Sequence, residues 1–234
     1  MSLGNAHEEI VNRSHGGLIP LHRLENFSDA VFAFAVTLLV VSLEVPRSAA
    51  DLFAVMRGFI AFGICFLFLV LIWVEHSRFF KRFPMADAVT VALNMLLLFV
   101  LLLYVYPLKF LFAALASSMI WGESVISINT LEEFRSLMVI YGLGFLALNL
   151  ILVCMKLHAL RLGGQGIPAP LATTDHLALN GGILRNIGQG LIALASILIA
   201  ATTQDDGRYC GLVYALLGPL AWIQGAYTRR QGRK

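Results

Sequence analysis

The sequence is poor in charged residues. Only 13% of its 234 residues are charged, whereas 59% are hydrophobic and the mean hydropathy is +0.80. An average soluble domain is about 25% charged, so this composition excludes an ordinary soluble domain and indicates an integral membrane protein. The formal net charge of +3 is small and the basic residues are grouped in short loops, which argues against a nucleic-acid partner.

Motifs for catalysis and for metal binding are also missing. The three cysteines are widely spaced, form no CxxC pair and have no His/Cys ligand spacing, so we expect them to be small apolar residues at helix interfaces. No GxSxG, HExxH, P-loop or dinucleotide fingerprint occurs. The sequence therefore predicts neither an enzyme nor a bound cofactor or metal.

Motifs that are typical of two classes of transport protein are absent as well. The chain has no TVGYG-like carbonyl filter. It has no pair of carboxylates in the middle of a span and no evident inverted repeat with broken helices, which a proton-coupled carrier would use.

Long apolar stretches make up most of the chain. A bilayer core needs about 20 apolar residues in a helix. Pro46 closes the first stretch and Pro84 opens the third, as expected for a residue without a backbone donor. The sequence predicts an all-α membrane protein with a cytoplasmic segment 1–26, a six-helix transmembrane domain 27–227 and a basic cytoplasmic tail 228–234. The six expected spans are 27–45, 52–75, 84–106, 134–157, 180–201 and 209–227.

The stretch 108–121 is apolar but short, and Pro107 stands where the third span should end. We interpret this stretch as an interfacial helix or an extension of the third span. A seventh crossing is the alternative, and it would move every later loop to the opposite side of the membrane.

The distribution of charge distinguishes these topologies. With the N-terminus inside, the inner segments contain twelve of the seventeen basic residues, and the outer loops are acidic. Lys and Arg in short loops favour the cytoplasmic side, so six crossings with both termini cytoplasmic are predicted. The first 26 residues lack the apolar core of a signal peptide, so we expect the N-terminus to be retained. The outer acids are Glu44, Asp51, Glu123, Glu132, Glu133, Asp205 and Asp206.

One acid interrupts the first apolar stretch. An ionised carboxylate in lipid costs several kcal/mol unless it is satisfied, so Asp29 should face protein or water. Arg23, about a turn and a half earlier, is the first candidate partner. The alternative is that Ser28 and Asp29 cap the start of the helix.

Two further polar sites lie at a similar depth in the next two spans. Trp73 and His76 stand near the cytoplasmic end of the second span, and Asn94 stands one or two turns into the third. Helices joined by short loops tend to be neighbours, so a buried hydrogen-bond network is predicted, with each contact contributing about 0.6–2 kcal/mol. His76 taken alone also fits a solvated interfacial histidine. The expected hydrogen-bonded residues are Arg23, Ser28, Asp29, His76 and Asn94, and Phe27 and Trp73 are assigned to the same structural network.

One face of the first span follows Asp29 at helical spacing. Periodicity does not distinguish a pore face from a packing face, and a threonine in a helix can bond its own preceding carbonyl. The residues on this face are Phe34, Thr37, Leu38, Val41 and Val45.

Three short motifs in the first half of the chain are Arg23-x-x-x-Phe27-Ser28-Asp29, Trp73-x-x-His76 and the single polar residue Asn94. They resemble the motifs of the first three helices in the transmembrane protein 175 family, which comprises the endolysosomal potassium channel and its bacterial homologues. The resemblance covers residues 23–107, and the later half matches only in hydropathy. A single six-span unit is similar to the bacterial form, because the animal protein carries two such units.

The resemblance implies a homotetramer in which four copies of the first helix line a central pore, with bulky apolar side chains at its narrowest point. Here that position falls to Phe34, with Leu38 and Val41 further along and Thr37 supplying a ring of hydroxyls. The family usually has Ile or Leu at the position of Phe34. A phenylalanine either makes a tighter hydrophobic gate or rotates out of the pore.

We therefore expect a cation channel in a bacterial inner membrane that conducts potassium, and other monovalent cations, passively and without a cofactor. The rival is a proton-linked secondary transporter that uses Asp29 and His76, and a membrane enzyme or structural partner is a third possibility. Saturating flux that depends on a proton gradient would indicate the carrier. A four-fold particle with a central pore would indicate the channel.

Overall fold

The computed structural model describes residues 18–41, 47–116, 130–162, 173–202 and 211–220. Regular structure in these segments is entirely helical, so the predicted all-α membrane fold is confirmed. The helices are α2 (Leu21–Val41), α3 (Ala49–Arg82), α4 (Ala88–Ala116), α5 (Leu131–Leu162), α6 (Thr173–Thr202) and the short 3-10 helix η2 (Val213–Leu216).

The helices follow the predicted spans in order. The first five spans fall on α2 to α6, and α3 to α6 are long and apolar enough to cross a membrane. Of the sixth span, only 211–220 lies within the described residues. The segment 1–17, residues 163–172 and the tail 228–234 lie outside them, as do Glu44, Glu123, Asp205 and Asp206.

The ends of α4 differ from the proline-based prediction. The helix begins at Ala88 rather than at Pro84, because the carboxylate of Asp87 accepts hydrogen bonds from the backbone N–H groups of Val89 and Thr90 and so caps the first turn. At the other end, α4 continues through Pro107 to Ala116. This favours the interpretation of 108–121 as an extension of the third span, as far as residue 116. Proline is tolerated inside membrane helices when neighbouring groups satisfy the freed carbonyl.

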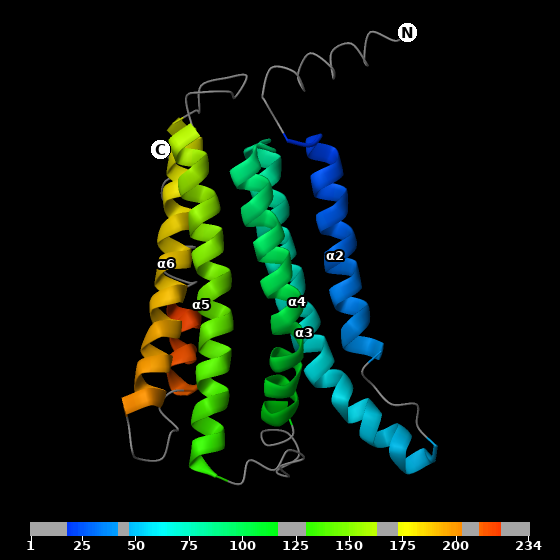
Figure 1. Cartoon of the computed structure of the whole chain (residues 1–234). Coiled ribbons are helices and arrows are strands. Elements are labelled where there is room, and N and C mark those ends of the chain that lie inside the picture. Colours follow the sequence, from blue (N-terminus) through cyan, green and yellow to red (C-terminus); the bar gives the residue numbers. More distant parts are fainter. Residues whose placement is uncertain (1–17, 42–46, 117–129, 163–172, 203–210, 221–234) are drawn as a thin grey trace.

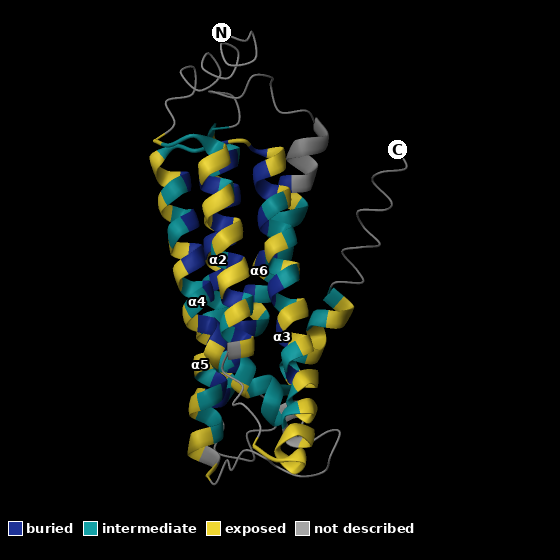
Figure 2. Ribbon diagram, turned by 90° about the vertical axis from the view of Figure 1, so that its right-hand side faces the viewer, coloured by how far each residue is buried: buried dark blue, intermediate teal, exposed yellow. Residues whose placement is uncertain are grey.

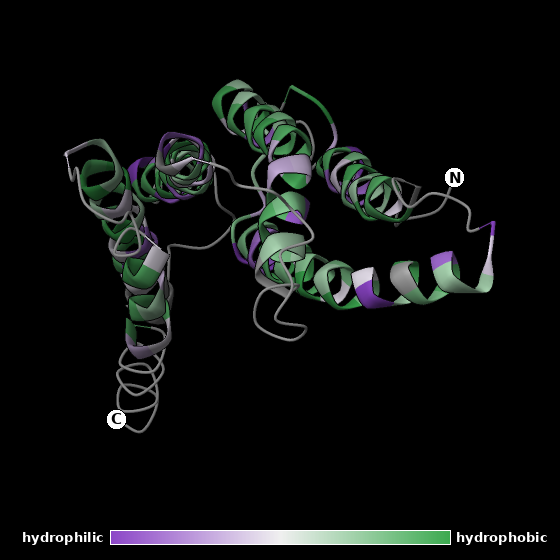
Figure 3. Ribbon diagram, turned by 90° about the horizontal axis from the view of Figure 1, so that it is seen from below, coloured by the Kyte–Doolittle hydropathy of each residue, from purple (hydrophilic) through white to green (hydrophobic). Residues whose placement is uncertain are grey.

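The helices alternate in direction and form two groups. Figure 1 shows α2, α3 and α4 on one side and α5, α6 and η2 on the other. Contacts with α2, α3 and α5 place α4 in the middle, and α5 and α6 form the most extensive helix pair. The beginning of α3 leans away from the bundle (Figure 1). Seen along their axes, the helices are predominantly hydrophobic (Figure 3).

Small residues allow the two groups to approach closely. A Cβ atom on Gly144 of α5 would collide with the ring of Tyr104 of α4. The hydroxyl of Tyr104 donates to the carbonyl of Tyr141, at 3.1 Å. Membrane helices gain little from hydrophobicity when they associate, so close packing at small residues and interhelical hydrogen bonds hold them together.

Candidate pore helix and its polar contacts

Three polar side chains from three helices form a directional hydrogen-bond chain. The Ser28 hydroxyl on α2 donates to the carbonyl of Leu24, at 2.8 Å, so its oxygen is available to accept. Asn94 Nδ2 on α4 donates to Ser28 Oγ at 2.9 Å, and Asn94 Oδ1 lies 2.7 Å from His76 Nε2 on α3. Ser28, His76 and Asn94 are all buried. The structure thus brings together three residues of the expected network.

This hydrogen-bond chain fixes the tautomer of His76. An amide oxygen only accepts, so Nε2 of His76 must carry the proton that it donates to Asn94. The other ring nitrogen, Nδ1, is buried and has no hydrogen-bond partner within the described ranges. The rings of Phe32 and Phe80 pack on the imidazole, with centroids 5.5 Å and 4.8 Å away. His76 is a buried contact residue rather than a solvated interfacial one.

Asp29 has a different partner from the one that the sequence suggested. Trp73 Nε1 on α3 donates to Asp29 Oδ1 at 2.7 Å. Within the part of the chain that the structure describes, no salt bridge joins Arg23 to Asp29, and Arg23 is exposed. The physical reason is helical phase. A separation of six residues turns the side chain by about 240°, so the two residues point in different directions.

The two sides of α2 differ in burial. One stripe at helical spacing is buried and comprises Leu24, Ser28, Phe32, Ala35 and Leu39. The opposite side is exposed in the single chain and includes Phe27 at 52% and Phe34 at 56% (Figure 2). Exposed apolar surface on this side must meet lipid, another subunit or a pore.

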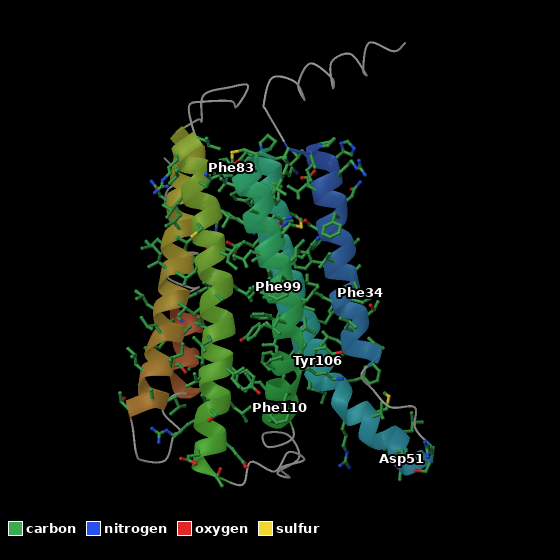
Figure 4. All side chains as sticks on the ribbon, viewed as in Figure 1. Phe34, Asp51, Phe83, Phe99, Tyr106 and Phe110 are labelled. Carbon is green, nitrogen blue, oxygen red and sulfur yellow. The ribbon has the colours of Figure 1, made fainter. Side chains whose placement is uncertain are left out.

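Two of the expected pore residues, Phe34 and Thr37, lie on this exposed side. Phe34 stands near the middle of α2 (Figure 4) and Thr37 is exposed, whereas Leu38 is half-buried. The Thr37 hydroxyl donates to the carbonyl of Phe34, at 2.7 Å. The side chain of Val41 and all of Val45 lie outside the described residues.

A second polar cluster was missed by the sequence reasoning. Glu75, adjacent to His76 on α3, accepts from Lys156 Nζ of α5 at 2.5 Å and forms an ion pair with Arg185 of α6. Lys156 Nζ also donates to Asn186 Oδ1 at 2.6 Å, and Asn186 Nδ2 donates to Asn149 Oδ1 at 3.1 Å. Lys156 is only 6% exposed. The cluster therefore holds a charged lysine inside the bundle.

The sequence did contain a signal for this cluster. Asn149 and Lys156 are seven residues apart within one apolar span, which places them on one face of a helix. A charged residue within a membrane span calls for a named partner. In the charge pattern of the sequence, Lys156 and Arg185 count only among the twelve basic residues of the inner side.

A third polar contact lies where α3 connects to α4. Asp87 accepts from His158 Nε2 of α5 at 2.8 Å and from the Thr90 hydroxyl at 2.5 Å. Burial opposes ionisation of Asp87, but the hydrogen bonds from Thr90 and His158 outweigh burial and lower the pKa of this carboxyl. Across the described ranges, no group of three or more His, Cys, Asp or Glu residues is arranged to hold a metal ion.

The fold and these contacts define a polytopic α-helical membrane protein. The family model of the endosomal/lysosomal potassium channel TMEM175 matches residues 23–107, the part that carries the three motifs. A protein of Marivirga tractuosa named "Potassium channel" is 36% identical over 226 residues, which cover 91% of this chain and 89% of that protein. A potassium channel of Streptomyces collinus is 33% identical over 91 residues, 36% of this chain and 44% of that protein.

Solved structures agree with these matches. The crystal structure of a threonine-to-alanine variant of the potassium channel MtTMEM175 superposes with a TM-score of 0.77 at 33% identity, covering 91% of this chain and 94% of that one. A homologue from Chamaesiphon minutus shares the fold, with a TM-score of 0.60 at 22% identity. The chain belongs to the TMEM175 potassium channel family, which consists of channels and not of enzymes.

Proposed function

We propose that this chain forms a potassium-permeable channel in which four copies of α2 surround the conduction path. The observation that carries the proposal is the division of α2 into a buried side, held by Asn94, and an exposed side that includes Phe34. Family membership supports the same conclusion, because the relatives matched over most of the chain are named as potassium channels. Conduction would be passive and would require no cofactor.

In this proposal, Phe34 forms the hydrophobic constriction and Thr37 adds a ring of polar groups. Four phenylalanine rings that converge on one axis exclude water unless the helices separate, and loss of water alone blocks ions. Leu38 and Val41 continue the apolar lining. The buried contacts of Ser28, Asn94 and His76, with Asp29 held by Trp73, hold the rear of the helix in place.

The proposed orientation places both termini in the cytoplasm of a bacterial inner membrane. Seven of the eleven described basic residues lie toward the end of the bundle where α2 begins, and Lys and Arg favour the cytoplasmic side. They are Arg23, Arg78, Lys81, Arg82, Lys156, Arg161 and Arg185. Asp51, Glu132 and Glu133 lie at the opposite end, where acidic groups would attract cations.

Flux into liposomes containing the purified protein tests the function. We expect potassium to flow down its gradient without saturation and without a proton gradient. Saturating flux that requires a proton gradient would instead support the transporter that uses Asp29 and His76. A second test is the particle itself, since four-fold symmetry with an axial path is expected by electron microscopy.

The gate is tested by replacing Phe34. We expect Phe34→Ala to raise potassium flux several-fold, because the constriction widens, and Phe34→Asn to do so by hydrating it. The matched control is Phe99→Ala on α4, which also removes a largely exposed ring. Phe32 is an unsuitable control because it is buried against His76. Equal effects at 34 and 99, or none at 34, would place the gate elsewhere, with Leu38 next.

A further inference from the structure

Two basic side chains at the end of the bundle where α2 finishes bind the last turns of other helices. Lys109 Nζ of α4 donates to the carbonyl of Leu39 on α2, at 3.2 Å. Arg135 of α5 donates to the carbonyls of Ala200 and Ala201 on α6, at 2.7 Å and 3.3 Å. These residues belong to the minority of basic residues that the charge distribution does not place on the inner side.

The chemistry of a helix end explains both contacts. The described part of α2 runs to Val41 and that of α6 to Thr202, so the bound carbonyls lie in the last turn described for each helix, and basic side chains near a helix C-terminus commonly bind such carbonyls. The same end carries the negative pole of the helix dipole, which favours a cation. A basic side chain from a neighbouring helix therefore binds a carbonyl of this turn and ties the turn to its neighbour.

The Lys109 contact has a counterpart on the same pair of helices. Asn94 of α4 holds α2 at Ser28, and Lys109 of α4 holds it at Leu39. The buried residues of α2 between these two points include Phe32 and Ala35, and those of α4 include Leu97, Leu101 and Val105, which are all apolar. Apolar packing permits sliding and rotation more readily than a directional hydrogen bond. The two polar contacts thus define the position of α2 along α4 at its two ends.

We propose that Lys109 is a positioning residue for conduction, which holds the outer end of α2 and so sets the width of the path beside Thr37 and Leu38. The inference rests on the proposed function, in which α2 lines the path. Lys109 is not itself assigned to the path. It acts through the carbonyl of Leu39, on the buried side of the helix.

Single-channel recording in planar bilayers tests the proposal. Lys109→Met removes the donor, and we expect the unitary potassium conductance to change at least twofold, whereas Lys109→Arg retains a donor and should restore it. The matched control is Arg135→Met, which removes the corresponding contact from α6. It should leave the unitary conductance unchanged, because α6 does not line the proposed path.

Recording at different salt concentrations distinguishes a displaced helix from a change in the local electrostatic potential. Removing a cation near the mouth also changes the local potential, but at about 1 M salt the Debye length is only about 3 Å. A displaced helix alters conductance at every salt concentration. A conductance change in Lys109→Met that persists in 1 M KCl supports the proposal, and one that disappears there overturns it. Equal changes in Lys109→Met and Arg135→Met, or none in Lys109→Met, also overturn it.

The two proposals can fail separately. If the wild-type protein conducts no potassium, the proposed function fails. If the wild type conducts and Lys109→Met is indistinguishable from it, only the role of Lys109 fails. Should Lys109→Met not assemble, Lys109→Gln is recorded instead; its amide nitrogen lies one bond nearer the backbone than the lysine ammonium, so it is expected to lose the contact with Leu39 and is judged by the same criteria as Lys109→Met.

Discussion

Two adjacent residues of α3 enter polar clusters of opposite character. His76 faces α2 and α4, where it joins a chain of neutral groups with Asn94 and Ser28. Glu75 faces α5 and α6, where it meets the charged side chains of Lys156 and Arg185. One residue along a helix turns the side chain by about 100°, so neighbours in sequence reach different helices.

The comparison shows two ways of joining membrane helices. The neutral chain costs less to bury, and its fixed donors and acceptors specify one arrangement of α2. The charged cluster costs more to bury, but removing one partner leaves an uncompensated charge in the bundle. We infer that the charged cluster contributes most to joining the two helix groups, and that the neutral chain contributes most to placing the pore helix.

The largest effect is expected from breaking the charged cluster. Glu75→Gln leaves Lys156 and Arg185 without their carboxylate, and we expect a loss of about 3–5 kcal/mol of stability. Thermal unfolding of the purified protein in detergent measures it. The double variant Glu75→Gln with Lys156→Met should recover part of the loss, because the buried lysine charge is also gone. Independent, additive losses would show that the two residues are not coupled.

A smaller effect is expected from breaking the neutral chain. Asn94→Leu removes the partner of both Ser28 and His76, and interhelical polar contacts in membranes contribute about 0.6–2 kcal/mol each. Because this hydrogen-bond chain holds α2, we expect the change in potassium flux per kcal/mol of stability lost to be larger in Asn94→Leu than in Glu75→Gln. Asn180→Leu, at an exposed position of α6, is the control. If flux falls in the same proportion to lost stability in Asn94→Leu and in Glu75→Gln, the two clusters do not differ in the way we infer.

The smallest effect concerns the partly exposed contact between Asp87 and His158. The pKa of Asp87 is lowered from its model-compound value of 3.8, so the folded state favours the ionised carboxylate. This stabilisation is present above that value and is lost as the pH falls through the lower folded-state pKa. Stability measured from pH 6 downwards should therefore decrease less steeply in Asp87→Asn than in the wild type. Parallel curves of stability against pH in the wild type and in Asp87→Asn would show that the Asp87 carboxylate does not contribute in this way.

The sequence anticipated the neutral chain better than the charged cluster. Ser28, His76 and Asn94 stand out because each is polar in an apolar span, and the helix order made their meeting reasonable. Asp29 and Trp73 were both assigned to the network, but proximity in sequence suggested Arg23 as the direct partner of Asp29, whereas Trp73 lies 44 residues away. Lys156 was counted with the basic residues of the inner side because it stands at the very end of the predicted span 134–157, whereas α5 continues to Leu162.

The sequence by itself determined the membrane class, the approximate spans and the motifs that mark the family, because these depend on composition and local spacing. The tertiary structure decided which side chains meet: Trp73 with Asp29, Glu75 with Lys156, and Lys109 with the end of α2. It also decided that α4 passes through Pro107. The physical reason is that contacts between helices depend on the rotation and offset of each helix about its own axis, and hydropathy leaves both of these undetermined.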